Sequence, residues 1–109
     1  MALVVVDAEN VRRSLWPNLS RERLVELARR WAGREGHELL IVFDGAAPEE
    51  APDLVSTGRE TADDWIVREA PRLAEPWWLV TSDRELKARA GGNAARIVGG
   101  GSFARELAG

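Results

Sequence analysis

Residues 3–6 are an unbroken run of branched apolar side chains, Leu-Val-Val-Val, that stops at Asp7. Such a run predicts a β-strand that is buried on both faces, as in a parallel sheet with helices on each side. Further runs of this kind occupy residues 39–43, 77–81 and 95–98. Residues 54–57 predict a weak edge strand. The chain therefore predicts a sheet of four to five strands that needs helices to cover both of its faces.

The segments between these runs have the pattern of amphipathic helices. Ser20 is a favourable N-cap, and the apolar residues after it recur at helical spacing on one face. The residues of that face are Leu24, Leu27, Ala28 and Trp31. We expect Gly33 to end this helix. Thr61 predicts the start of a second helix, and Pro71 is expected to kink or end it.

The last third of the chain predicts two more helices. Ser82 and Glu85 have the spacing of a capping box, and the helix that they open is expected to run to about Ala90. Ser102 is expected to open a short final helix. Strands that alternate with helices predict an α/β fold, here one domain over residues 1–109 with a mostly parallel sheet flanked by helices.

The composition excludes several kinds of chemistry. The 109 residues include no cysteine and one histidine, and the formal net charge is −3. Disulfides, thiolate metal sites, cysteine nucleophiles and catalysis by paired histidines are therefore excluded. No apolar run approaches the roughly 20 residues of a membrane span, and the first apolar run is too short for a signal peptide. We expect a cytoplasmic protein that has no membrane partner.

Acidic residues follow the predicted strands. Asp7, Asp44 and Asp83 come at or just after the ends of the first three long runs, and Asp63 lies at the start of the helix after the weak edge strand. The carboxyl ends of parallel strands lie on one edge of the sheet, which is where ligands bind in folds of this class. We therefore expect the four carboxylates to share one rim. His37 lies at the opposite end of the second strand, and we expect it to be structural.

Each acid also has a purely structural interpretation. Asp7 and Asp44 could be turn residues, and negative charge at Asp63 and Asp83 is favoured in the first turn of a helix. A purely structural role is harder to accept for all four acids on one rim, because two carboxylates about 6 Å apart repel by roughly 3 kcal/mol at an effective dielectric constant of about 20. A divalent cation would offset that repulsion, and a site with oxygen ligands alone favours Mg²⁺ or Mn²⁺.

Five short motifs, in order along the chain, resemble those of one protein family. They are VVVDAEN (4–10), VFDG (42–45), ETAD (60–63), VTSD (80–83) and SFAREL (102–107). Together they look like the NYN domains of the PIN-like nuclease superfamily, and in particular like the YacP-type proteins. The likeness spans nearly the whole chain. One departure is Glu9, which stands where these domains usually have an aromatic or small residue.

The resemblance implies a Rossmann-like (PIN-like) three-layer fold and a metal-dependent endoribonuclease that hydrolyses RNA phosphodiester bonds, acting on mRNA or ribosome-bound RNA. It implies that Asp7, Asp63 and Asp83 are the catalytic residues and that they are the ligands of Mg²⁺ or Mn²⁺. The residues that it implies are supporting are Asn10, Asp44 and Ser82. Attack by hydroxide would leave a 5′-phosphate and a 3′-hydroxyl.

RNA also requires positive charge near the site. The basic residues that fall close to the predicted rim, and that we expect to contact phosphate, are Arg12, Arg13, Arg59, Arg84 and Lys87. Trp16 lies in the loop beyond Asn10. From the sequence, this tryptophan could either stack on a base or cap the core.

Two other functions also place acids at strand ends. A non-catalytic RNA-binding or ribosome-associated module could keep the fold without cleaving RNA. A phosphotransfer enzyme or receiver fits poorly, because a haloacid dehalogenase-type enzyme needs aspartate where this chain has Glu9, and a receiver needs lysine at the end of a late strand, whereas Lys87 lies inside a predicted helix. RNA cleavage that requires metal and Asp7 separates the nuclease from the module.

Overall fold

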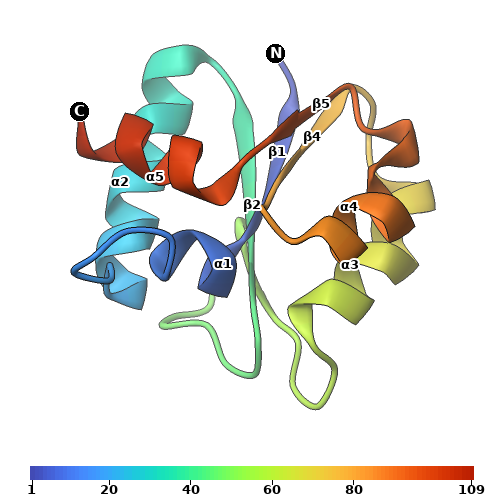
Figure 1. The fold of residues 1–109 in the computed structure, drawn as a ribbon, viewed down its shortest axis with the longest axis horizontal. Helices are drawn as coiled ribbons and strands as arrows, with labels where there is room; N and C mark the ends of the chain where they lie inside the picture. The colour runs from blue at the N-terminus through green and yellow to red at the C-terminus, as the bar shows by residue number, and fades with distance from the viewer.

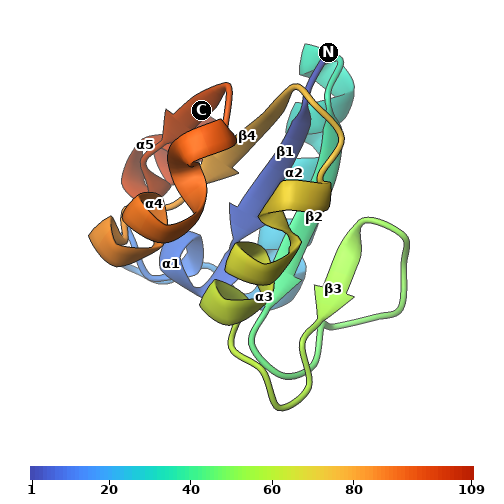
Figure 2. The same ribbon diagram turned by 90° about the vertical axis from the view of Figure 1, so that its right-hand side faces the viewer.

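Five parallel strands form one sheet at the centre of the computed structural model, which describes residues 1–109. The strands are β1 (Leu3–Asp7), β2 (Glu38–Phe43), β3 (Leu54–Ser56), β4 (Trp77–Val80) and β5 (Arg96–Val98). Their order across the sheet is β3-β2-β1-β4-β5, and the short strand β3 lies at one edge (Figure 2). The predicted strands, including the weak edge strand, are confirmed.

The strand order reverses beside the central strand β1. From β1 the chain moves outward on one side through β2 and β3, and it then crosses to β4 and β5 on the other side. In open parallel sheets, ligands bind outside the carboxyl ends of the strands at this point of reversal. In this chain that point lies between the carboxyl ends of β1 and β4.

Helices cover both faces of the sheet. They are α1 (Ala8–Arg12), α2 (Arg21–Glu35), α3 (Ala62–Glu69), α4 (Arg84–Ala90) and α5 (Gly100–Ala108), with short 3₁₀ helices at Ala70–Arg72 and Gly91–Asn93. Figure 1 shows α1, α2 and α5 on one side of the sheet and α3 and α4 on the other. The predicted three-layer α/β fold is therefore confirmed. None of these helices has the length and apolar character needed to cross a bilayer.

Alternate side chains of the strands pack against the two helix layers. Val4 and Val6 of β1 belong to the apolar cluster that includes residues of α1, α2 and α5. Val5 belongs to the cluster that includes residues of α3 and α4. All three valines are fully buried. Burial on both faces explains why β1 carries no polar side chain before Asp7.

Two helix ends differ from the expectation from sequence. Helix α2 continues through Gly33 to Glu35, and it ends at Gly36, whose φ of 74° lies in the left-handed region. A residue in that conformation closes the helix, and glycine adopts it without steric strain. Helix α5 begins at Gly100, before Ser102.

His37 lies beside the amino end of β2 and helps to close that end of the sheet. Its Nδ1 accepts a hydrogen bond from Ala2 N–H at 3.0 Å. Its ring stacks on Trp31 with a centroid separation of 5.5 Å, and it lies 4.5 Å from the ring of Trp78. The single histidine is thus occupied by contacts far from the carboxyl edge.

Two hydrogen bonds join three segments of the chain at the carboxyl edge of the sheet. Asn10 Oδ1, on α1, accepts from Ser82 N–H at 2.9 Å, and Ser82 Oγ accepts from Gly100 N–H at 2.8 Å. The start of α5 is thereby held against α1 and the segment after β4. Gly100 fits there because it has no side chain: an added Cβ would overlap Asn10 Oδ1 and lie 2.9 Å from Ser14 Oγ.

Gly100→Ala should lower the free energy of unfolding by about 1–3 kcal/mol, because the methyl group must displace Asn10 Oδ1 from Ser82 N–H. Gly101→Ala is the matched control. Its added Cβ would lie 3.5 Å from the nearest atom, the flexible Arg105 guanidinium, so this variant should be neutral or slightly stabilised. Urea unfolding curves measure both. Equal stability of the two variants would show that the close approach of α5 to Asn10 is wrong.

Candidate active site

A polar pocket opens at the carboxyl edge of the sheet. Its volume is about 350 Å³, and none of its lining residues is hydrophobic. The lining residues are Asp7, Glu9, Asn10, Arg13, Ser14, Asp44, Asp63 and Asp83. The structure therefore brings the four predicted aspartates together in one pocket, although they come from four separate segments of the chain.

Asp7 ends β1 and lies at the bottom of this pocket. The residue is only 5% exposed, and its Oδ2 accepts a hydrogen bond from the Thr81 hydroxyl at 3.0 Å. Burial raises the pKa of Asp7 to about 6, and the nearby carboxylates of Asp63 and Asp44 add to the increase, whereas the bond from Thr81 opposes it. Burial thus destabilises the ionised form of Asp7, and a bound cation would stabilise it.

Thr81 connects Asp7 to Asp83. The Thr81 hydroxyl donates to Asp7, and the same oxygen accepts a hydrogen bond from Asp83 N–H at 3.1 Å. Thr81 is fully buried. Sequence reasoning did not select it as a site residue. The available signal was its position, because it is a polar residue between a buried apolar strand and an acid.

Asp83 is the N-cap of α4, a role that the sequence had suggested for Ser82. Asp83 Oδ1 accepts a hydrogen bond from Leu86 N–H at 3.0 Å. The hydroxyl of Ser82 instead accepts from the backbone of α5. The cap fixes the orientation of the Asp83 carboxylate, so this side chain is held at the pocket by its own helix.

Asp44 and Asp63 are linked through the start of α3. Asp44 Oδ1 accepts from Ala62 N–H at 2.6 Å, which fastens the first turn of α3 to the end of β2. Asp63 is the next residue, and it is half-buried. Its pKa is raised by burial first, and then by the charges of Asp83 and Asp44. The four aspartates are therefore close enough to repel one another.

None of the four aspartates forms an ion pair with a cationic side chain, although the nearby charge of Arg89 partly opposes the increase in the pKa of Asp63. The ion pairs of the chain involve other acids throughout. The structure also contains no group of three or more histidine, cysteine or acidic side chains that could hold a metal ion as they stand. The pocket thus offers carboxylate oxygens that form no ion pairs, which fits Mg²⁺ or Mn²⁺ in ligand type without being a preformed cage.

Glu9 differs from the aspartates because its charge is paired. Its Oε1 lies 2.7 Å from Arg12 Nη1 and 3.3 Å from Arg13 Nη2, and its Oε2 lies 3.8 Å from Arg21 Nε. Arg12 also donates from Nε to the carbonyl oxygen of Leu19 at 2.9 Å. The Arg12 guanidinium is therefore committed to structural contacts, whereas Arg13 lines the pocket with a side chain that is 68% exposed.

The other predicted phosphate-binding residues are not part of the pocket lining. Arg59 precedes α3, and Arg84 and Lys87 are on α4. Arg59 and Arg84 are exposed, Lys87 is half-buried, and none of the three takes part in an ion pair. By contrast, the guanidinium of Arg89 lies 3.3 Å from Asp64.

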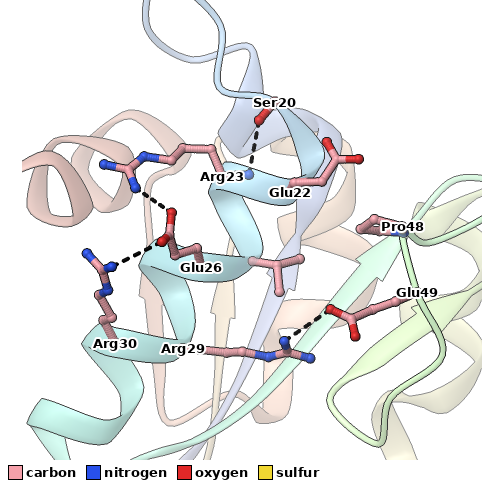
Figure 3. Close-up of a pocket in the computed structure, with 9 residues that line it drawn as sticks. Ser20, Glu22, Arg23, Glu26, Arg29, Arg30, Pro48 and Glu49 are labelled. Carbon is pink, nitrogen blue, oxygen red and sulfur yellow. Dashed lines mark hydrogen bonds and ion pairs between the residues drawn. The ribbon is translucent and has the colours of Figure 1, made fainter.

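A larger hollow lies on the outer face of α2, and it has different chemistry. Its volume is about 770 Å³, and Figure 3 shows the charged side chains that surround it. Glu26 pairs with Arg23 and Arg30, and Arg29 pairs with Glu49. Because these opposite charges already satisfy one another, the acidic pocket is the stronger candidate for an active site.

Asp7→Asn should stabilise the protein at neutral pH in the presence of a chelator. The pKa of Asp7 in the folded protein, about 6, lies above its ordinary value of 3.8, so the folded state binds this proton more tightly than the unfolded chain does. Stability should therefore fall as the pH rises from about 4 to about 6, and a penalty of at most about 3 kcal/mol should persist above that range. Removal of the charge should recover about 1–3 kcal/mol at pH 7.5 and little at pH 4.

Urea unfolding in EDTA at the two pH values measures this difference. Glu22→Gln is the matched control, because Glu22 is exposed and forms no ion pair, so its effect should stay within about 0.5 kcal/mol at both pH values. If Asp7→Asn is less stable than the parent at pH 7.5, the negative charge at this position is compensated after all.

Comparisons with known proteins agree with this geometry. The sequence profile of the YacP-like NYN domain matches residues 4–109. A crystal structure of a point mutant of Rae1 (YacP) from Bacillus subtilis is similar with a TM-score of 0.80 and 24% identity, covering 99% of this chain and 76% of that chain. The structure of Rae1 (YacP) from the same organism without that mutation is similar with a TM-score of 0.73 and 21% identity. This match covers 99% of this chain and 74% of that chain.

No curated protein sequence matches the chain. The structural likeness lies below 25% identity and so concerns the fold, whereas the profile match covers nearly every residue. The chain therefore belongs to the YacP-like NYN domain family, within the PIN-like nucleases.

Proposed function

We propose that the protein is a metal-dependent endoribonuclease that hydrolyses phosphodiester bonds of mRNA or ribosome-bound RNA in the cytoplasm. The observation that carries the proposal is the pocket in which Asp7, Asp44, Asp63 and Asp83 meet without a cationic partner. Membership of a nuclease family supports the reaction class. The position of the pocket at the reversal of strand order supports its use as a ligand site.

The residues that would hold the metal are Asp7, Asp63 and Asp83. When bound there, Mg²⁺ or Mn²⁺ would make a water molecule more acidic and would shield the charge of the phosphate. Magnesium is commonly held by one or two carboxylates, with water and substrate phosphate as its other ligands, so a preformed set of three protein ligands is not required.

The supporting residues act on the shape of the pocket. Thr81 holds the Asp7 carboxylate, and Asp44 fixes the first turn of α3 and thereby the position of Asp63. Asn10 and Ser82 hold α1, the segment after β4 and α5 together through their hydrogen bonds. These contacts keep the acids in place while they repel one another.

Positive charge around the pocket would bind the RNA backbone. Arg13 lines the pocket, and Arg59, Arg84 and Lys87 lie on segments that border it. Arg12 serves instead to hold Glu9 and the loop after α1. Because phosphate contacts of this kind release counterions, RNA binding should weaken as the salt concentration rises.

Asn substitutions at Asp7, Asp63 and Asp83 should each reduce RNA cleavage by at least about 100-fold, because each removes a charged oxygen from the pocket. Asparagine can still cap a helix, so Asp83→Asn should leave α4 intact. The assay follows a labelled RNA with Mg²⁺ or Mn²⁺ and with EDTA, and circular dichroism checks the fold. Glu22→Gln is the control that should cleave normally.

Cleavage that persists in EDTA or in Asp7→Asn would contradict the proposal. If the parent binds RNA, and neither metal nor ribosomes produce cleavage, the chain is instead a non-catalytic RNA-binding module. The aspartate variants would then bind RNA as well as the parent does, or better, since each removes negative charge.

A further inference from the structure

Trp16 is the most exposed large aromatic side chain of the protein. It is 89% exposed, whereas Trp31 and Trp77 are 3% and 1% exposed. Trp65 and Trp78 are partly buried and pack against the two apolar clusters. Tryptophan has a large apolar surface that is usually buried at least in part. The structure thus excludes the role of capping the core, which the sequence alone had left open.

The loop that carries Trp16, residues 13–20, is held at both ends. Leu19 N–H donates to the Arg12 carbonyl at 3.1 Å, and Arg12 Nε donates to the Leu19 carbonyl at 2.9 Å. Leu15 and Leu19 pack against the apolar cluster under α2. Trp16 therefore projects from an anchored turn, which is the blue loop between α1 and α2 in Figure 1.

The same loop forms one wall of the acidic pocket. Arg13 and Ser14 line that pocket, and Trp16 follows Ser14 by two residues. Because consecutive Cα atoms are 3.8 Å apart, the Trp16 backbone lies within about 8 Å of the pocket lining. Arg21, at the start of α2, is exposed, and its Nε lies 3.8 Å from Glu9 Oε2, whereas Arg13 lies beside Glu9 Oε1. The loop that carries the exposed indole thus borders the pocket, and it contributes Arg13 to the pocket lining.

An exposed indole and an exposed guanidinium group on one loop match the chemistry of a nucleotide. Bases stack on aromatic rings whatever their identity, and guanidinium groups bind the phosphates that link them. We propose that Trp16 is the base-stacking residue of a nucleotide subsite next to the reactive phosphate, with the exposed guanidinium group of Arg13, which lines the pocket, holding the adjoining phosphate. The inference rests on the proposed action on RNA, and it adds a subsite that the acidic pocket does not contain.

The test measures binding of a short single-stranded RNA to the full chain in EDTA, by fluorescence anisotropy. Trp16→Ala should weaken binding by about tenfold or more, whereas Trp16→Phe should retain most of the affinity because it keeps an aromatic ring. Asn18→Ala is the matched control, since Asn18 is an exposed residue of the same loop and should bind as the parent does.

A set of RNAs in which one nucleotide at a time lacks its base tests the stacking itself. In the parent, one such RNA should bind about tenfold more weakly than the complete RNA. In Trp16→Ala, the loss of that base should have no further effect. Equal affinity of the parent and Trp16→Ala for every RNA would overturn the subsite, and it would show that the indole serves a different surface.

Cleavage assays with Mg²⁺ separate this inference from the function on which it rests. Cleavage by the parent that is unchanged in Trp16→Ala overturns the subsite alone. Binding that depends on Trp16 without any cleavage by the parent overturns the nuclease and retains the subsite. If the parent neither binds RNA nor cleaves it with Mg²⁺ in the presence of ribosomes, both proposals are wrong.

Discussion

The buried carboxylate of Asp7 is the constraint around which the carboxyl edge of this protein is arranged. It ends a strand that is packed on both faces, and the chain supplies no cationic side chain to pair with it. Burial raises its pKa to about 6, because this position destabilises a negative charge. Every neighbouring feature either limits that penalty, as the Thr81 hydroxyl does, or increases it, as Asp63 and Asp44 do.

A position that is unfavourable for an isolated charge is favourable for a cation. The repulsion among the four aspartates lowers the stability of the folded protein, and the same charges would attract a divalent ion. Backbone contacts hold three of the four segments in place: Asp83 caps α4, Asp44 accepts from the first turn of α3, and Thr81 joins Asp7 to the backbone of Asp83. The scaffold therefore maintains a charge arrangement that the acids alone would not adopt.

Glu9 shows how a further acid beside the four aspartates is accommodated. A buried glutamate beside the four aspartates would add to their repulsion, and here Arg12, Arg13 and Arg21 gather around it. This cluster also joins α1 to the loop that follows it, because Arg12 binds the carbonyl of Leu19. Glu9 and its arginine partners thus organise both a wall of the pocket and the loop that carries Trp16.

The sequence by itself determined the helix and sheet layers, the parallel sheet and the acids at its carboxyl edge. A strand that is buried on both faces is an uninterrupted apolar run, and the first polar residue after the run marks the end of the strand. The sequence could not determine which of two adjacent residues caps α4. Ser82 and Asp83 are both good N-caps, and only the packing of α5 against Ser82 decides between them. The sequence also could not show that Arg12 is held by structural contacts while Arg13 lines the pocket. The partner that holds Arg12, the carbonyl oxygen of Leu19, comes close only when the loop after α1 has folded. Contacts between segments that are distant in the chain exist only after folding, and those contacts select the charges that remain free.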